Sequence, residues 1–184
     1  TKTLHSWHKL GVSYFASDEV WNDEGEIEPV DTDYTEWAVS YYGQLGITGW
    51  FDIWTSFAYK YGTSENDREE LTTAGVGDIT LATQFRFLQK PLVMSGQFAF
   101  TAPWAYDRDA WLPLGDGFPD YELKLLVGRS MYPVPGYFGL EGGYKIREGF
   151  QPNLWVYLVE VGFNVWKVYA RVKLDGFSSA EGVD

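Results

Sequence analysis

The feature that most constrains this chain is an alternation of apolar and polar residues with a period of two. In its clearest segment one set is Trp166, Val168, Ala170, Val172 and Leu174, and the other is Lys167, Tyr169, Arg171 and Lys173. Successive side chains of a β-strand point to opposite faces of the sheet. A shift of one residue would move three cations to the apolar face, so the register of this strand is strongly specified.

Eight further segments show the same alternation. They span about residues 7–16, 34–43, 51–61, 78–87, 94–101, 121–128, 138–146 and 155–164. Each is near the roughly 9–11 residues with which a tilted strand crosses a bilayer, and no run of about 18 apolar residues offers a transmembrane helix. The pattern predicts an all-β fold of about nine strands, each with one apolar and one polar face.

The connections between these segments alternate in length. Long polar connections span residues 17–33, 62–75 and 103–120, whereas short ones include 89–91 and 133–136. Long extracellular loops and short periplasmic turns are typical of outer-membrane barrels. The chain, residues 1–184, is therefore expected to be a single antiparallel transmembrane up-and-down β-barrel domain of about 9–12 strands. Bacterial single-chain barrels have even strand numbers, and an open edge in lipid leaves backbone groups unpaired, so we expect the last strands to be missing.

Charge is distributed unevenly over these predicted faces. The formal net charge is −12, which argues against nucleic acid as a partner because phosphate binding needs a basic surface. The charged residues predicted to face the lumen are Glu36, Asp52, Lys60, Asp78, Arg86, Glu122, Lys124, Glu141, Lys145, Glu160, Lys167, Arg171 and Lys173. With Lys9 and Arg147 they make nine bases and six acids, a predicted lumen charge of +3. Opposite charges on one face can pair across neighbouring strands.

Aromatic residues gather near the ends of the predicted strands. Trp and Tyr favour a membrane–water interface because their rings are apolar and end in a polar group. The residues that we expect at this interface are Trp50, Tyr59, Tyr61, Tyr121, Trp155 and Trp166, with Trp7, Tyr34, Trp104 and Tyr137 as further candidates.

Several short motifs resemble a known family in their order and spacing. They are YYGQLGIT at 41–48, GVGDITL at 75–81, GDGFPD at 115–120, LLVGRS at 125–130 and GGYKIR at 142–147. Over roughly residues 12–175 the chain resembles the outer-membrane barrels described as transporters of the meta-pathway of phenol degradation. The resemblance implies a pore or transporter in the outer membrane, for small aromatic or apolar compounds.

Other chemistry is poorly supported by the residues. His5 and His8 would point to opposite faces of a strand, which disfavours a metal site, and Ser6 lacks a positioned base. The acidic residues Asp23, Glu24, Glu26, Glu28 and Asp31 lack the regular spacing of a Ca²⁺ loop. The pair Gly75-x-Gly77 reads as the start of a strand and not as a phosphate cradle, because no helix or lysine follows. We expect no enzymatic activity, metal or cofactor.

Three functional hypotheses follow. The first is a porin-like channel that passes small solutes across the outer membrane of a Gram-negative bacterium, in contact with membrane lipid and lipopolysaccharide. The second is a structural or anchoring barrel with a plugged lumen, whose acidic loops hold partner proteins or further copies of the chain. The third is a soluble β-sandwich or lipocalin-like binder, whose apolar faces would point inward. Strand number separates the first two, because about eight strands leave an interior filled by side chains.

Overall fold

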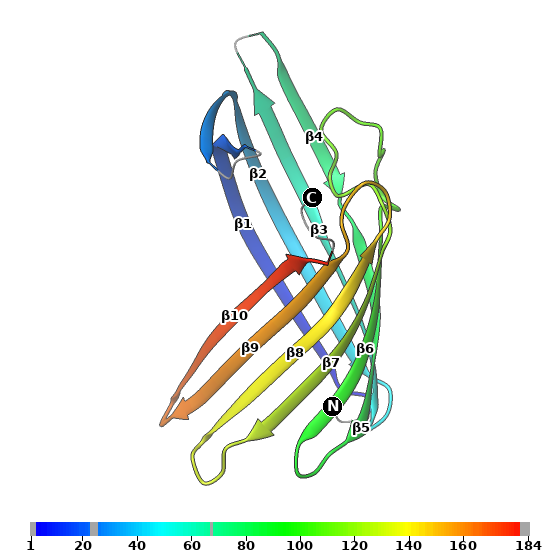
Figure 1. Ribbon diagram of the computed structural model, residues 1–184, viewed down its shortest axis with the longest axis vertical. Helices are drawn as coiled ribbons and strands as arrows, with labels where there is room; N and C mark the ends of the chain where they lie inside the picture. The colour runs from blue at the N-terminus through cyan, green and yellow to red at the C-terminus, as the bar shows by residue number, and fades with distance from the viewer. Residues whose placement is uncertain (1–2, 23–25, 67, 181–184) are drawn as a thin grey trace.

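The structure, a computed structural model, describes residues 3–22, 26–66 and 68–180 and consists of one antiparallel sheet (Figure 1). Its strands are β1 (Ser6–Trp21), β2 (Ile27–Gly46), β3 (Phe51–Glu65), β4 (Glu70–Val76), β5 (Ile79–Leu88), β6 (Val93–Ala102), β7 (Asp120–Ser130), β8 (Gly136–Arg147), β9 (Leu154–Val165) and β10 (Val168–Ser179). Every ladder joins strands that are consecutive in the chain, except that β3 pairs with both β4 and β5. The predicted all-β, antiparallel, up-and-down architecture is confirmed.

Strands β4 and β5 are two parts of one interrupted strand. Both pair with β3, β4 with residues 59–65 and β5 with residues 51–56. Gly77 donates its amide hydrogen to the carbonyl of Ala58, and the next pair is Ser56 with Thr80, so one extra residue is inserted opposite β3. Such a bulge shifts which residues face each side of a sheet. With β4 and β5 counted together, the sheet has the nine strands that the alternation predicts.

The connections that were predicted to be short all lie at one end of the sheet. They are residues 47–50, 89–92, 131–135 and 166–167, and Figure 1 shows them at the lower end. The position of these turns is as predicted. At the other end the predicted loops 17–33 and 62–75 are wrong in extent. β1 ends at Trp21 and β2 begins at Ile27, whereas β3 ends at Glu65 and β4 begins at Glu70. These extensions are rich in polar residues, and their few apolar residues do not recur at every second position, so the apolar alternation cannot reveal them.

The third predicted loop differs from the other two. Residues 103–119 contain no strand and connect β6 to β7 at the upper end of the sheet. This connection returns to the sheet and contacts its wall, as described below.

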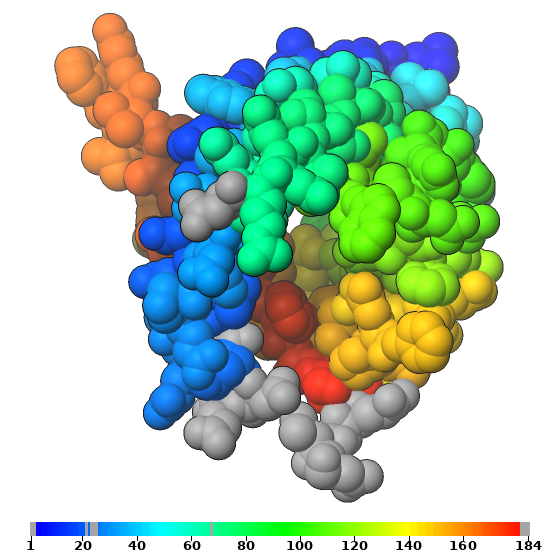
Figure 2. All heavy atoms as spheres, turned by 90° about the horizontal axis from the view of Figure 1, so that it is seen from above, coloured from blue at the N-terminus to red at the C-terminus, as the bar shows by residue number. Residues whose placement is uncertain are grey.

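The sheet is strongly curled. Seen from above, its elements surround a hollow (Figure 2). Within the described residues β1 pairs with β2 alone and β10 with β9 alone, so the two edges are not joined to each other. The arrangement is a curled, open sheet with barrel-like curvature.

Most of the large apolar residues of the strands face outward. Leu123 is 64% exposed, Leu174 65% and Val172 75%, and among the described residues no large side chain is fully buried. The buried apolar residues of the sheet are small, namely Ala38, Ala82, Ala99 and Ala102. This distribution is the reverse of the inward apolar faces that the soluble sandwich or lipocalin-like hypothesis predicts.

Candidate functional site

A cavity that is lined by strands from both halves of the sheet identifies the inner face. Lys9, Tyr42 and Ser56 from β1, β2 and β3 border the same cavity of about 640 Å³ as Glu160 and Arg171 from β9 and β10. Residues paired across neighbouring antiparallel strands share a face. The pairing register therefore assigns the inner face throughout the sheet.

The predicted lumen-facing charges lie on this inner face, with one exception. Glu36, Asp52, Lys60, Asp78, Arg86, Glu122, Lys124, Glu141, Lys145, Glu160, Arg171 and Lys173 share it. Lys167 was predicted there and is not, because it lies in the turn 166–167, with its Nζ 5.3 Å from the centre of the Trp166 ring. Trp166 adopts a positive φ of 57°, a conformation usually marked by Gly or Asn in such turns. The sequence has neither there, and the apolar–polar alternation that continues along β10 already includes both turn residues.

Two acids that the strand pattern missed also face inward. Asp120 pairs with Thr101 and Arg147 at the start of β7, and Asp175 pairs with Leu158 on β10. Among the described residues the inner face thus carries eight bases, Lys9, Lys60, Arg86, Lys124, Lys145, Arg147, Arg171 and Lys173. It also carries eight acids, Glu36, Asp52, Asp78, Asp120, Glu122, Glu141, Glu160 and Asp175. The inner face is electrically balanced, in place of the +3 expected.

Most of these charges form ion pairs. Lys60 lies 3.3 Å from Glu36, Arg171 3.2 Å from Glu160, and Lys173 3.3 Å from Asp175. Lys124 lies 2.9 Å from Glu122 and 3.8 Å from Glu141. Pairing makes charges tolerable where water is scarce.

The most buried pair is at the upper end of β7 and β8. Asp120 is 4% exposed, and its carboxylate lies 2.6 Å from Lys145 Nζ and 3.8 Å from Arg147 Nε. Arg147 also reaches Asp116 in the 103–119 connection, at 2.8 Å. This cluster joins the sheet to that connection.

A second inner cavity, of about 450 Å³, has two kinds of wall. On β7 and β8 it is lined by charged residues, including Glu122, Lys124 and Lys145. On β9 and β10 the lining includes the apolar residues Leu154, Val156, Leu158 and Phe177 beside the charged residues Lys173 and Asp175. A small molecule with an apolar body and a polar end would find complementary surfaces here.

The opposite wall carries an aromatic cluster. Trp7, Tyr42 and Trp54 come from three adjacent strands, β1 to β3, and Tyr42 lies between the other two. Its ring centre is 5.3 Å from that of Trp7 and 5.4 Å from that of Trp54, with the Tyr42 and Trp54 rings stacked. Trp54 shares the inner face with Tyr42, because its partner on β2 is Gln44, two residues after Tyr42. Trp7 was expected at the membrane interface and instead lines the inner cavity, because the pairing of Trp7 with Gln44 sets its face.

Two more interface candidates also face inward. Tyr34 donates a hydrogen bond to Glu36 at 3.0 Å, and Tyr137 donates one to Glu160. Tyr137 and Tyr169 lie on the inner face with their hydroxyls 2.6 Å apart. For these residues the partner across the strand, and not the position near a strand end, decides the direction of the ring.

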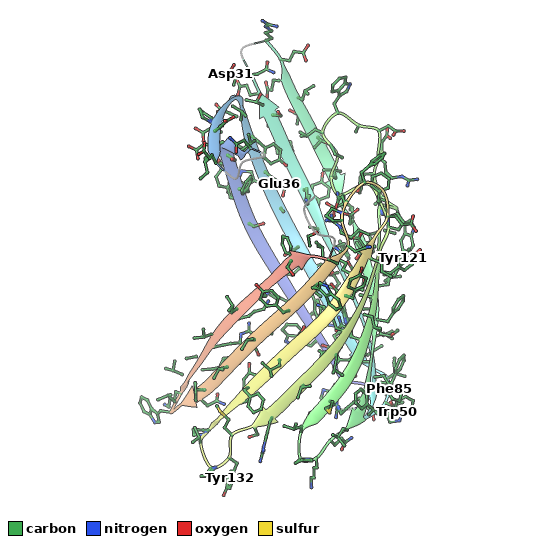
Figure 3. The ribbon with its side chains drawn as sticks, in the orientation of Figure 1. Asp31, Glu36, Trp50, Phe85, Tyr121 and Tyr132 are labelled. Atoms are coloured by element: carbon green, nitrogen blue, oxygen red, sulfur yellow. The ribbon has the colours of Figure 1, made fainter. Side chains whose placement is uncertain are left out.

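The remaining interface candidates lie on the outer face or at the ends of the sheet. Tyr121 packs on Phe100, and Trp50 packs on Phe85 with the ring centres 4.9 Å apart. Figure 3 shows Trp50 and Phe85 at the lower end and Tyr121 higher on the same side. Trp155 contacts Tyr144, Trp104 contacts Phe100, and Trp166 lies in the lower turn. Tyr59 and Tyr61 face outward within β3 and not at its end, because β3 is longer than predicted.

The connection 103–119 rests on the inner wall. Leu114 is 6% exposed and contacts the wall at Gly75 and Gly77. Tyr106 donates a hydrogen bond of 2.7 Å to Asp78, which also accepts one from the backbone amide of Asp116 at 3.0 Å. Burial, followed by the hydrogen bond to Asp78, raises the pKa of Tyr106 to about 12. Sequence reasoning treated this segment as an external loop.

The weaker chemical candidates can also be placed. The His8 ring lies 2.8 Å from the Tyr41 hydroxyl on the outer face. Over the described part of the chain, no group of three or more His, Cys, Asp or Glu side chains is arranged to hold a metal ion. Asp23 and Glu24 of the acidic segment lie outside the described residues.

Comparison with known proteins found no matching family model and no matching curated protein. Among the described residues, no helix has the length and hydropathy of a transmembrane segment.

Proposed function

We propose that this chain is a porin-like β-barrel channel of the bacterial outer membrane that passes small solutes by diffusion. The observation that carries the proposal is the opposite character of the two faces of the sheet. The outer face presents large apolar residues such as Leu123 and Leu174, whereas the inner face is lined by paired charges. An apolar outside and a polar inside are the requirements of a barrel in lipid.

Strand length and turn placement support the same proposal. Strands β5 to β10 have 10 to 12 residues, near the roughly 9–11 residues of a tilted membrane-spanning strand. The end of the sheet where every connection has five residues or fewer would be the periplasmic end, because the other end carries the long connection 103–119. In this orientation the extended hairpins of β1–β2 and β3–β4 project on the extracellular side, towards lipopolysaccharide.

Spanning a bilayer also sets a condition on the two edges. Unpaired backbone groups in lipid cost several kcal/mol each, and β1 and β10 each have a free edge within the described residues. In the membrane both edges need partners, supplied by further strands or by another copy of the chain.

The inner walls suggest which solutes would pass. The stacked Tyr42 and Trp54 offer an apolar platform on one side, and Val156, Leu158 and Phe177 offer an apolar patch on another. Balanced charges between them disfavour strong selection for either ion sign. These features suit small molecules with apolar or aromatic parts, which is also what the resemblance to the phenol meta-pathway barrels implies.

The decisive experiment is ion conductance of the detergent-purified protein in a planar lipid bilayer. Discrete, reproducible steps with weak selectivity between anions and cations are expected. A chain that is monomeric and water-soluble without detergent would overturn the proposal. Added small aromatic compounds should block the current transiently, and the block should weaken in Trp54→Ala.

The second candidate function is an anchoring barrel with a closed lumen, and the packing of residues 103–119 on the inner wall favours it. Protein that is folded and inserted yet electrically silent, together with a copurifying partner at the acidic hairpins, would favour that function.

A further inference from the structure

The connection 103–119 occupies a notch in the inner wall. A Cβ atom on Gly75 would lie 2.8 Å from Leu114 Cδ1, and one on Gly77 would lie 2.7 Å from the Leu114 carbonyl oxygen. Real Cβ atoms show no such contacts, so a side chain at either glycine would displace the connection. Leu112 lies nearby, with its Cδ2 atom 3.8 Å from the corresponding position on Gly62. The glycines at 75 and 77 thus allow the backbone of one segment to approach the other.

Asp78 binds both ends of this connection. Its two carboxylate oxygens accept the hydroxyl hydrogen of Tyr106 and the amide hydrogen of Asp116. The Tyr106 hydroxyl in turn accepts the amide hydrogen of Gly117, which adopts a positive φ of 77°. The bulge at Gly77 and Asp78 lets Gly75, Gly77 and Asp78 all meet the same segment.

The connection also reaches the wall on the far side of β7. Arg147 on β8 lies 2.8 Å from Asp116, and Phe118 packs against Gly149. The segment therefore extends along the inner wall from β4–β5 to β8. In Figure 2 this part of the chain forms one side of the rim that borders the hollow.

We propose that residues 103–119 form the constriction that limits the size of the solutes admitted, and that Asp78 is the positioning residue that holds this constriction on the wall. The inference rests on the proposed channel function. Docking reduces the free cross-section at the upper end of the cavity. Release of the segment widens that section without changing the sheet.

Conductance of matched variants tests this role. Asp78→Ala removes both hydrogen bonds, and Gly77→Ala places a methyl group against the Leu114 backbone. Their controls are Asp175→Ala, which removes an inner carboxylate with no contact to the segment, and Gly142→Ala, whose added methyl group would meet no atom within 4 Å. Both docking variants should show about twofold higher single-channel conductance and admit larger sugars in liposome-swelling assays, because conductance follows the narrowest section. The controls should show neither the twofold rise in conductance nor the admission of larger sugars.

A cross-link tests the docked position independently of any current. The chain contains no cysteine, so Gly75→Cys combined with Leu114→Cys creates the only thiol pair. In this double variant Leu114→Cys removes the Cδ1 atom that a Cβ on Gly75 would otherwise meet. Oxidation of the folded protein in detergent should join the two residues, as seen by a shift on a non-reducing gel, and reduction should reverse it. Failure of the link in folded protein overturns the docked arrangement.

The outcomes separate the two proposals. Equal conductance of the wild type and both docking variants, with clear steps in each, overturns the constriction and leaves the channel in place. Silence from inserted wild-type protein and from every variant overturns the channel. If Asp78→Ala does not fold, Tyr106→Phe removes one of the same hydrogen bonds without removing a charge, and the same increase is expected.

Discussion

The Tyr106 hydroxyl donates a 2.7 Å hydrogen bond to the Asp78 carboxylate, which ties the first part of the longest connection to the bulge between β4 and β5. A neutral donor on a charged acceptor makes one of the stronger hydrogen bonds in a protein. Its geometry explains why a polar segment without strand structure keeps one position against the wall.

Tyr106→Phe should loosen this connection. Loss of a hydrogen bond to a charged group costs about 1.5–3 kcal/mol, and Arg108 in the same segment is an exposed trypsin site. Cleavage after Arg108 should therefore be at least roughly 10-fold faster than in the wild type, since 1.4 kcal/mol corresponds to that factor. Tyr59→Phe, a change on the outer face of β3, is the control. Equal cleavage rates in all three proteins would show that the hydrogen bond does not hold the segment.

The same contact should depend on pH only under strongly alkaline conditions. The pKa of Tyr106 is raised to about 12 from its ordinary value of 10, by burial and by the Asp78 carboxylate. The stabilisation is therefore complete below pH 10 and is lost as the pH rises through about 12. The difference in absorbance at the tyrosinate band between the wild type and Tyr106→Phe isolates this titration. A midpoint near 10 would contradict the buried, hydrogen-bonded state.

Two neighbouring leucines on β7 provide a test of the membrane-facing side. Leu125 pairs with Gly142 and faces outward, whereas Leu126 pairs with Glu141 and borders an inner cavity. A lysine on the lipid face costs about 2–4 kcal/mol near the bilayer midplane, so Leu125→Lys should lower the stability in lipid vesicles by about that amount. Leu126→Lys should lower it less, because its ammonium group lies near Glu141 and Glu160. Urea unfolding from vesicles measures both, and the opposite order would show that the outer face is not in lipid.

The ion pairs of the inner face should differ in strength according to their burial. Asp120 and Lys145 have side-chain exposures of 5% and 24%, whereas Lys173 and Asp175 have 42% and 62%. Asp120→Asn leaves Lys145 facing a neutral group in a shielded site and should cost about 1–3 kcal/mol of unfolding free energy. Asp175→Asn, at an exposed pair, should cost less than about 1 kcal/mol. Double-mutant cycles with Lys145→Gln and Lys173→Gln measure the coupling, and equal couplings would mean that burial of these pairs is not maintained in solution.

Much of the fold could be predicted from the alternation of residues. It indicated the nine strands, the face of nearly every predicted inner charge and the positions of the short turns. The alternation gives no signal where apolar residues do not recur at every second position, so the sequence predicts loops at the extensions of β1 to β4. It also failed at Trp166 and Lys167, where a tight turn forms without Gly or Asn.

The features missed in the site depend on contacts between distant segments. Asp120 precedes the first alternating residue of its strand and gains its role from Lys145 and Arg147. The inward position of residues 103–119 depends on Asp78, Gly75 and Gly77, which precede that segment in the chain. One signal was present in the sequence: two glycines separated by a single residue beside an acidic one indicate a place where another backbone can approach closely.

The sequential order of the sheet has a consequence for how the chain is built. Because each ladder of the described sheet joins segments that are close in the chain, every strand after β1 can pair with a strand synthesised shortly before it. Pairing between segments that are close in sequence closes short loops, so less conformational entropy is lost before the strand contacts form. The chain can therefore be laid down one hairpin at a time, with the newest strand always serving as the template for the next.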